Sequence, residues 1–142
     1  MSTNKAENYG LVVNLPATLD ESELARLDEL IAAKKDLIAK ALGASQLTIT
    51  TTNDGLSFPW WDELPEFEKI TAYTEFLTKL VAYARRIRRT TSRAASSESA
   101  NEKYELRSLL YRIGLGGKEH APVRKILLAP LSGNSAWKEA KK

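Results

Sequence analysis

The sequence predicts an α+β fold that is mostly helical, with a small two- to three-stranded antiparallel sheet packed on a long central helix and a C-terminal helix pair. Three observations support this prediction. Two short alternating runs, the first of them rich in β-branched residues, flank the turn signal Asn53-Asp54-Gly55. Apolar residues recur at spacings of three and four over residues 67–87. Gly114 separates two further amphipathic segments, residues 102–113 and 121–128.

The chain of 142 residues is expected to form one domain, 1–142, because a chain of this length buries about two thirds of its unfolded surface. The polar ends, 1–9 and 138–142, are predicted to be frayed tails. Residues 91–100 contain no aromatic residue and no Leu, Ile or Val. We interpret them as a flexible loop within the domain, because the chain beyond them is short for a separate domain.

Two segments predict the sheet. Leu11–Leu15 is short, apolar and β-branched, which is typical of a strand. Leu47–Thr52 and Leu56–Phe58 then alternate on either side of the Asn53–Gly55 turn and predict a hairpin, with Pro59-Trp60-Trp61 ending its second strand. Because two strands alone are marginal, we expect Leu11–Leu15 to pair with the hairpin or a helix to cover one face.

The first helix is predicted to run to Gly43, a residue that suits a left-handed C-terminal cap. Its start offers two capping boxes, Thr18 with Glu21 and Asp20 with Glu23. One apolar stripe extends along its whole length, which predicts a single helix. The stripe consists of Leu24, Leu27, Leu30, Ile31, Ile38, Ala41 and Leu42.

The central helix is predicted from about Pro65 to about Thr90, with Asp62 as its cap. Its stripe has heptad-like spacing and consists of Phe67, Ile70, Tyr73, Leu77, Leu80, Ala84 and Ile87. Aromatic residues precede it and recur near the end of the chain, as Phe58, Trp60, Trp61 and Trp137. We interpret this aromatic set as core packing between sheet and helix, with base stacking or a protein interface as the alternatives.

The C-terminal helix pair is predicted from its end signals. Asn101 suits the cap of the first helix and Gly114 its end, while Pro122 starts the second helix and Pro130 closes it. The pair is similar to a helix-turn-helix, although Leu110 and His120 fit poorly where that motif needs small or apolar residues. In that interpretation Lys118, His120, Arg124 and Lys125 would face the major groove.

Charge is divided unevenly along the chain, and this division supplies the candidate site. Residues 1–80 hold 7 Lys+Arg against 13 Asp+Glu, whereas residues 81–142 hold 14 against 5, within a net charge of +3. A basic half suggests a polyanionic partner, and Arg suits bidentate contacts with phosphate. The candidate nucleic-acid-binding residues are Arg85, Arg86, Arg88, Arg89, Arg93, Arg107, Arg112, Lys118, Arg124 and Lys125.

Two alternatives to this site follow from the same charge division. The acidic and basic halves can pair with each other within the fold, which would leave the arginines structural. The acidic half can also serve as a protein-binding surface, with the Asp and Glu residues of 20–36 and 62–75 as its candidates.

Several classes of function lack the residues that they need. No cysteine is present, so disulfides, thiolate nucleophiles and Cys-ligated metals are excluded. His120 is the single histidine, and neither a Gly-x-Ser-x-Gly elbow nor a Gly-Lys-Ser/Thr phosphate loop occurs. Paired carboxylates lie at predicted helix starts and on polar faces, where capping and solvation explain them. We therefore predict no enzyme, no cofactor and no metal site.

The expected location is cytoplasmic, with no membrane partner. No apolar run approaches the roughly 20 residues that span a bilayer. The first residues, Met1–Asn8, are polar and have no apolar core, so they are not interpreted as a signal peptide.

The sequence resembles a family of small proteins of unknown function, labelled "virulence-related", that are encoded on integrative and conjugative elements of Gram-positive gut bacteria. The resemblance implies a mobile-element setting and carries over no functional residues. It covers the chain from about residue 11 to 137 and rests on Val13–Leu24, Leu30–Gly43, Phe58–Trp60, Asn101–Tyr104, Arg124–Leu128 and Leu131–Ala136.

The functional hypothesis is a non-enzymatic mobile-element protein that binds DNA, or RNA, through backbone phosphates as an accessory or regulatory factor. The basic C-terminal half would carry this function. The alternative is a protein-protein interaction module that binds a host or element-encoded protein through the acidic half. One such partner would be a host defence nuclease, which the chain would inhibit in the manner of an anti-CRISPR protein.

Overall fold

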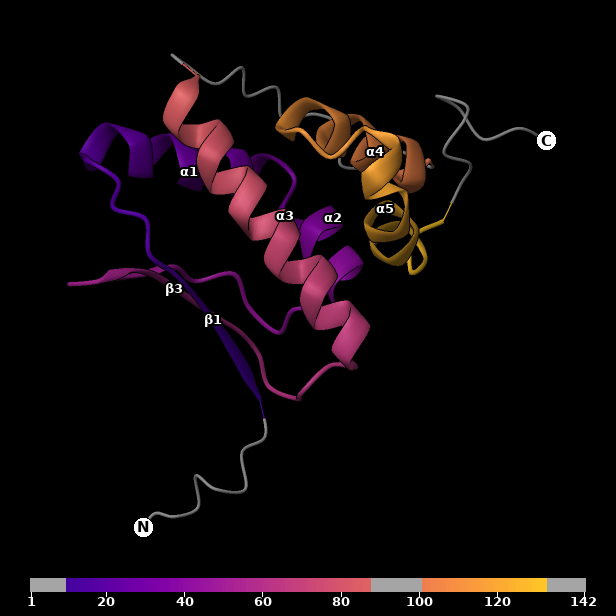
Figure 1. The fold of residues 1–142 in the computed structure, drawn as a ribbon, viewed down its shortest axis with the longest axis horizontal. Helices are drawn as coiled ribbons and strands as arrows, with labels where there is room; N and C mark the ends of the chain where they lie inside the picture. The colour runs from indigo at the N-terminus through magenta and orange to yellow at the C-terminus, as the bar shows by residue number, and fades with distance from the viewer. Residues whose placement is uncertain (1–9, 88–100, 133–142) are drawn as a thin grey trace, which may run out of the picture.

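The computed structural model describes residues 10–87 and 101–132 and confirms the α+β fold (Figure 1). The predicted tails 1–9 and 138–142, the predicted loop 91–100 and Trp137 lie outside these residues. The elements are β1 (Leu11–Leu15), α1 (Glu21–Ala33), α2 (Lys35–Leu42), β2 (Thr50–Thr52), β3 (Gly55–Trp61), α3 (Phe67–Arg86), α4 (Glu102–Ile113), the 3-10 helix η2 (Lys118–His120) and α5 (Ala121–Leu128).

The three strands form an antiparallel sheet in the order β1-β3-β2. This order confirms the hairpin and the pairing of Leu11–Leu15 with it. The first hairpin strand is shorter than predicted, because it begins at Thr50. The Thr48 carbonyl accepts a hydrogen bond from the Trp60 indole at 2.8 Å, so it is bound to a side chain of the neighbouring strand.

The prediction that Pro59-Trp60-Trp61 ends the second hairpin strand is wrong. β3 continues to Trp61 and forms the middle of the sheet. The pairing with β1 changes register here, since Val13 lies opposite Phe58 while Leu11 lies opposite Trp61. A proline has no N–H to donate to a ladder, and a bulge is one of the few places where a central strand accepts it.

The predicted first helix is two helices. α1 ends at Ala33 and α2 begins at Lys35, because Lys34 adopts φ −129° and ψ 32°. The buried residues of α1 pack against α3, whereas α2 lies against α4 and α5. One straight helix cannot face both sets of partners, so tertiary packing breaks a continuous stripe.

The ends of these two helices follow the local signals. Of the two capping boxes, the structure forms Asp20 with Glu23, in which Asp20 Oδ1 accepts from the Glu23 N–H at 2.8 Å and Glu23 Oε1 accepts from the Asp20 N–H at 3.0 Å. The Glu23 N–H, as the largest cause, lowers the pKa of Asp20. Gly43 closes α2 with φ 63°, as its sequence position predicts.

α3 is shorter than predicted at both ends. Asp62 does not cap it, because the helix starts at Phe67 with Glu66 at the N-cap. Phe67 was assigned to the apolar stripe but its side chain is 82% exposed. The helix ends at Arg86, and Ile87 is extended with ψ 153°. The Ala84 carbonyl in its last turn accepts from Arg26 Nε at 3.1 Å, which satisfies one of the carbonyl groups that a helix end leaves unpaired.

The C-terminal helix pair forms as predicted. The Asn101 side chain accepts from the Tyr104 N–H at 3.2 Å and caps α4, and Gly114 ends the helix with φ 103°. Pro122 lies in the first turn of α5. The inward residues of α4 are all buried, namely Leu106, Leu109, Leu110 and Ile113.

Side chains from the sheet and from all five α-helices build one hydrophobic core. Figure 1 shows α3 crossing the molecule, with β1 and β3 on one side and α4 and α5 on the other. Trp60 and Trp61 are buried, and Trp61 stacks on Tyr73 of α3 at a centroid distance of 5.3 Å. This confirms core packing for both tryptophans. Among the described residues, no helix combines the length and apolar character that spanning a membrane requires.

Candidate functional site

The corner between α4 and α5 holds two arginines against one tyrosine. Tyr111 projects from α4 and its side chain is 43% exposed. The guanidinium carbon of Arg107 lies 4.5 Å from the centroid of this ring, and that of Arg124 lies 5.1 Å from it. Arg107 Nη2 also donates to the Tyr111 hydroxyl at 3.0 Å. We call Arg107, Tyr111 and Arg124 the Tyr111 cluster.

The turn after α4 fixes this cluster in place. Arg124 Nη1 donates to the carbonyl oxygens of Leu115 and Gly117, each at 2.8 Å. A Cβ added at Gly116 would lie 2.4 Å from Tyr111 Cδ2, so only glycine leaves room for the ring in this position. Arg124 therefore arrives from α5 with its guanidinium bound to the turn and close to the ring.

This geometry differs from the helix-turn-helix interpretation. That interpretation expected Arg124 to face the major groove, but the structure bonds its guanidinium to the turn of its own chain. Lys118, directly after Gly117, and Lys125 are exposed. His120 is partly buried, and its Nε2 lies 3.7 Å from the Glu119 carboxylate.

The structure brings only some of the predicted basic residues together. Arg107 and Arg124 meet on Tyr111, with Lys118 next along the turn. Arg85 and Arg86 are exposed at the end of α3, where Arg86 lies 5.1 Å from the centroid of Tyr83. Arg112 is exposed on α4. Arg88, Arg89 and Arg93 lie outside the described residues.

The predicted pairing between the acidic and basic halves occurs in the opposite sense. Lysines of the acidic half bind glutamates of the basic half: Lys34 Nζ lies 2.9 Å from Glu105 Oε1, and Lys40 Nζ lies 2.9 Å from Glu102 Oε1. We call these four residues the α2–α4 junction. Within residues 10–87 and 101–132, no carboxylate lies within 4.0 Å of the basic groups of Arg85, Arg86, Arg107, Arg112, Lys118, Arg124 or Lys125.

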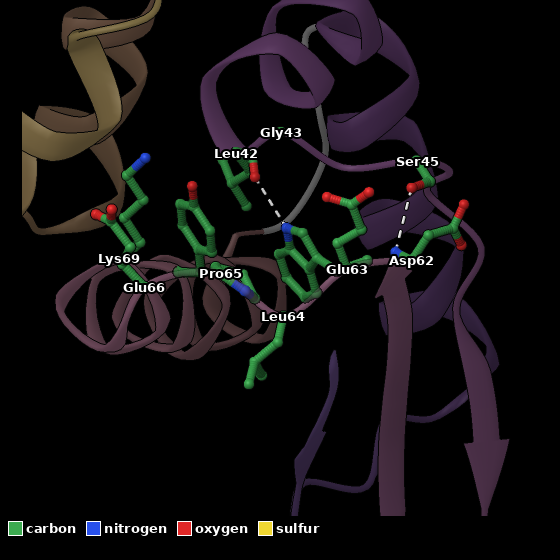
Figure 2. Close-up of a pocket in the computed structure, with 11 residues that line it drawn as sticks. Leu42, Gly43, Ser45, Asp62, Glu63, Leu64, Pro65, Glu66 and Lys69 are labelled. Atoms are coloured by element: carbon green, nitrogen blue, oxygen red, sulfur yellow. Dashed lines mark hydrogen bonds between the residues drawn. The ribbon is translucent and has the colours of Figure 1, made fainter. Parts of the chain in front are cut away.

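A second candidate site is an open cavity of about 420 Å³ where β3 passes into α3 (Figure 2). We call it the acidic cavity, because the carboxylates of Asp62, Glu63 and Glu66 line it beside a single ammonium group, that of Lys69. The buried rings of Trp61 and Tyr73 also line it. In the part of the chain that the structure describes, none of the three carboxylates forms an ion pair.

Local hydrogen bonds position the acidic cavity. The Trp61 indole donates to the Leu42 carbonyl at 2.8 Å, and the Asp62 N–H donates to Ser45 Oγ at 3.3 Å (Figure 2). Burial raises the pKa of Tyr73, and the negative charge of Glu66 raises it further. The Tyr73 hydroxyl therefore stays protonated at neutral pH.

One exposed apolar residue, Leu64, lines the acidic cavity, and a second, Phe67, follows the lining residue Glu66 in the chain. Leu64 is 59% exposed and Phe67 is 82% exposed. Figure 2 shows the side chains of Glu63 and Leu64 leaving the loop in opposite directions. Among the described residues, the other large apolar side chains that are exposed belong to Val12 and to Tyr111. Of these four residues, Leu64 belongs to the acidic cavity and Tyr111 to the Tyr111 cluster, while Phe67 is next to Glu66 of the cavity in the chain.

Sequence analysis did not single out Tyr111, Leu64 or Phe67 as site residues. For Tyr111 a signal was present, because Arg107 and Tyr111 are four residues apart on a helix and Gly116 follows the helix end. For Phe67 the heptad-like spacing was misleading, since it continued the stripe into the first turn of α3. No group of three or more His, Asp or Glu residues is arranged to hold a metal ion in the described part of the chain.

The chain matches no protein-family model, no curated protein and no solved structure. The resemblance to the "virulence-related" family therefore stays a prediction.

Proposed function

We propose that the protein binds nucleic acid, without an enzymatic step, through the surface around the Tyr111 cluster. The observation that carries this proposal is the arrangement of Arg107 and Arg124 on one exposed tyrosine ring with no carboxylate partner among the described residues. Lys118 adds a third positive charge next to the turn. Such a surface offers several cationic donors to phosphate oxygens.

The local contacts favour a polyanion over a small acidic ligand. Arg124 uses Nη1 on the turn carbonyls, so its position is set before a ligand arrives. The Tyr111 ring holds the guanidinium groups of Arg107 and Arg124 close together, so two cationic donors are offered at one place. Phosphate contacts supply affinity that is independent of sequence and weakens as salt concentration rises. An accessory or regulatory role on a mobile element rests on the family resemblance.

The test is fluorescence anisotropy with labelled duplex and single-stranded DNA and RNA at rising salt. We expect affinity to fall at least about tenfold between about 50 mM and 200 mM salt. Arg107→Ala and Lys118→Ala should each lower the salt slope by about 1. Lys35→Ala, which removes an exposed lysine of α2, is the matched control and should leave the slope unchanged. Absence of binding at low salt, or affinity that does not depend on salt, would overturn the proposal.

We infer a second candidate function from the acidic cavity, namely binding of a protein partner. The supporting observation is that three carboxylates without an ion pair among the described residues line one cavity with the exposed Leu64, and that the exposed Phe67 starts the helix directly after Glu66. A host defence nuclease is one such partner, because its nucleic-acid channel is basic. The test is capture from a nuclease-treated host lysate. A partner that is lost with Phe67→Ser and retained with Val12→Ser supports this function, and equal capture by both variants contradicts it.

A further inference from the structure

We infer that the acidic cavity receives the Tyr111 cluster of a second copy of this chain. The inference rests on the second proposed function, protein binding at the acidic cavity, and names its partner. The two surfaces are complementary in charge. One carries Asp62, Glu63 and Glu66 without ion pairs among the described residues, and the other carries Arg107, Arg124 and Lys118 without a carboxylate partner there.

The two surfaces also match in their apolar parts. Leu64 in the cavity lining and Phe67, which follows Glu66 in the chain, are exposed, and so is part of Tyr111. We call the Tyr111 cluster together with Lys118 the basic corner. Aromatic and arginine side chains are the residues that protein interfaces favour at their centres, with charges around them. A contact between these surfaces would cover exposed apolar side chains and pair charges that have no ion pair among the described residues of one chain.

The positions of the two surfaces along α3 require a second copy. The cavity includes Lys69 in the first turn of α3, whereas a Cβ at Gly114, at the end of α4, would lie 3.8 Å from Lys79 Cδ. Ten residues of helix separate Lys69 from Lys79, which is about 15 Å along the axis. Each copy can therefore offer its basic corner to one neighbour while its acidic cavity binds another.

The resulting contact is heterologous, because two different surfaces meet. Heterologous contacts build rings or open chains of molecules, whereas a surface that meets itself gives a closed dimer. Nucleic acid and the second copy would compete for Arg107 and Lys118. We therefore expect short DNA to dissociate the assembly.

The experiment is sedimentation velocity on the full chain over a range of concentrations. The expected result is a sedimentation coefficient that rises with concentration at about 50 mM salt and rises less at about 200 mM. Phe67→Ser and Lys118→Glu should each reduce association, since each removes one of the two surfaces. Val12→Ser and Lys35→Glu change another exposed apolar residue and another exposed lysine elsewhere, and should associate like the original chain.

Mixing the two defective variants gives the decisive result. Phe67→Ser keeps its basic corner and Lys118→Glu keeps its acidic cavity, so an equimolar mixture should form a 1:1 dimer that does not grow further. No association in the mixture, association that the Phe67→Ser and Lys118→Glu variants retain, or a monomer at all concentrations would overturn the inference. A monomer that still captures a partner through Phe67 would leave the second proposed function standing. Circular dichroism confirms that each variant is folded.

Discussion

The α2–α4 junction and the Tyr111 cluster both contain charged side chains of α4, but they satisfy those charges differently. At the junction, Glu102 and Glu105 bind lysines from the acidic half of the sequence. In the cluster, Arg107 and Arg124 rest on an aromatic ring, and Arg124 donates to backbone carbonyls. Charge is neutralised where α4 meets the acidic half, whereas Arg107 and Arg124 have no carboxylate partner among the described residues. The difference shows which part of the basic half remains available to an anionic partner.

The largest effect on stability is expected at Glu102. Its Oε1 accepts from Lys40 Nζ at 2.9 Å and from the Ser132 N–H and Oγ at 3.0 and 3.1 Å, so one oxygen joins α2, the start of α4 and the segment after α5. Glu102→Ala should lower the free energy of unfolding by about 1–2 kcal/mol, measured by urea titration. Glu119→Ala is the control, because that side chain is 75% exposed. Equal stability of the two variants would show that the junction contributes nothing.

Arg124 should show a smaller but measurable effect. Its loss leaves the carbonyls of Leu115 and Gly117 without this donor and removes one partner of the Tyr111 ring. Arg124→Ala should lower the free energy of unfolding by about 1 kcal/mol in urea. Arg112→Ala removes an exposed arginine with no partner among the described residues, and its effect should stay within about 0.5 kcal/mol. A reversal of this order would mean that Arg124 is not held by the turn.

The coupling energy between Lys34 and Glu105 at the α2–α4 junction is expected to be smaller than the two effects above. Lys34 and Glu105 are about one quarter exposed, at 25% and 24%. A double-mutant cycle with Lys34→Ala and Glu105→Ala should return a coupling of about 0.5 kcal/mol, in the range of partly exposed ion pairs. The same cycle applied to Arg107→Ala and Glu105→Ala should return a coupling near zero, because in the structure Glu105 pairs with Lys34 while Arg107 donates to Tyr111. Equal couplings would remove the distinction between the two regions.

The caps and turns were predictable from sequence because their causes are local. Asn101, Gly114 and Gly43 each act within a few residues of their own position, through a side-chain acceptor or a positive φ. The hairpin turn and the pairing of its strands followed for the same reason. These local signals predicted the fold class and, to within a few residues, most of the helix and strand ends.

The remaining features depend on contacts between distant residues. The break at Lys34 results from two helices packing on different partners, and the end of α3 has a capping donor from Arg26, 58 residues away. The sequence also did not reveal which half supplies the lysines and which the glutamates of the ion pairs between the two halves, because a count of charges gives no positions. The basic half was therefore predictable from the sequence, but the structure was needed to determine whether its arginines lie beside carboxylates.

The smallest expected effect is a difference between the two regions in how their contribution to stability depends on pH. The hydrogen bond from Lys40, followed by that from the Ser132 N–H, lowers the pKa of Glu102. A carboxyl with a lowered folded pKa contributes stability that is present above its unfolded pKa of about 4.3 and is lost as the pH falls through the folded value. The Tyr111 cluster has no carboxylate partner among the described residues, so we expect no corresponding loss of stability there.

The measurement compares the original chain with Glu102→Gln by urea titration from neutral pH to about pH 3. Asp20 also has a lowered pKa and contributes in the same direction, so both proteins should lose stability on acidification. The original chain should lose more, and the difference between the two should shrink as Glu102 becomes protonated. Arg107→Ala should shift the whole curve without changing its dependence on pH. A Glu102→Gln curve parallel to the original would show that the junction does not depend on the Glu102 charge, and that the contrast with the cluster lies in hydrogen bonding alone.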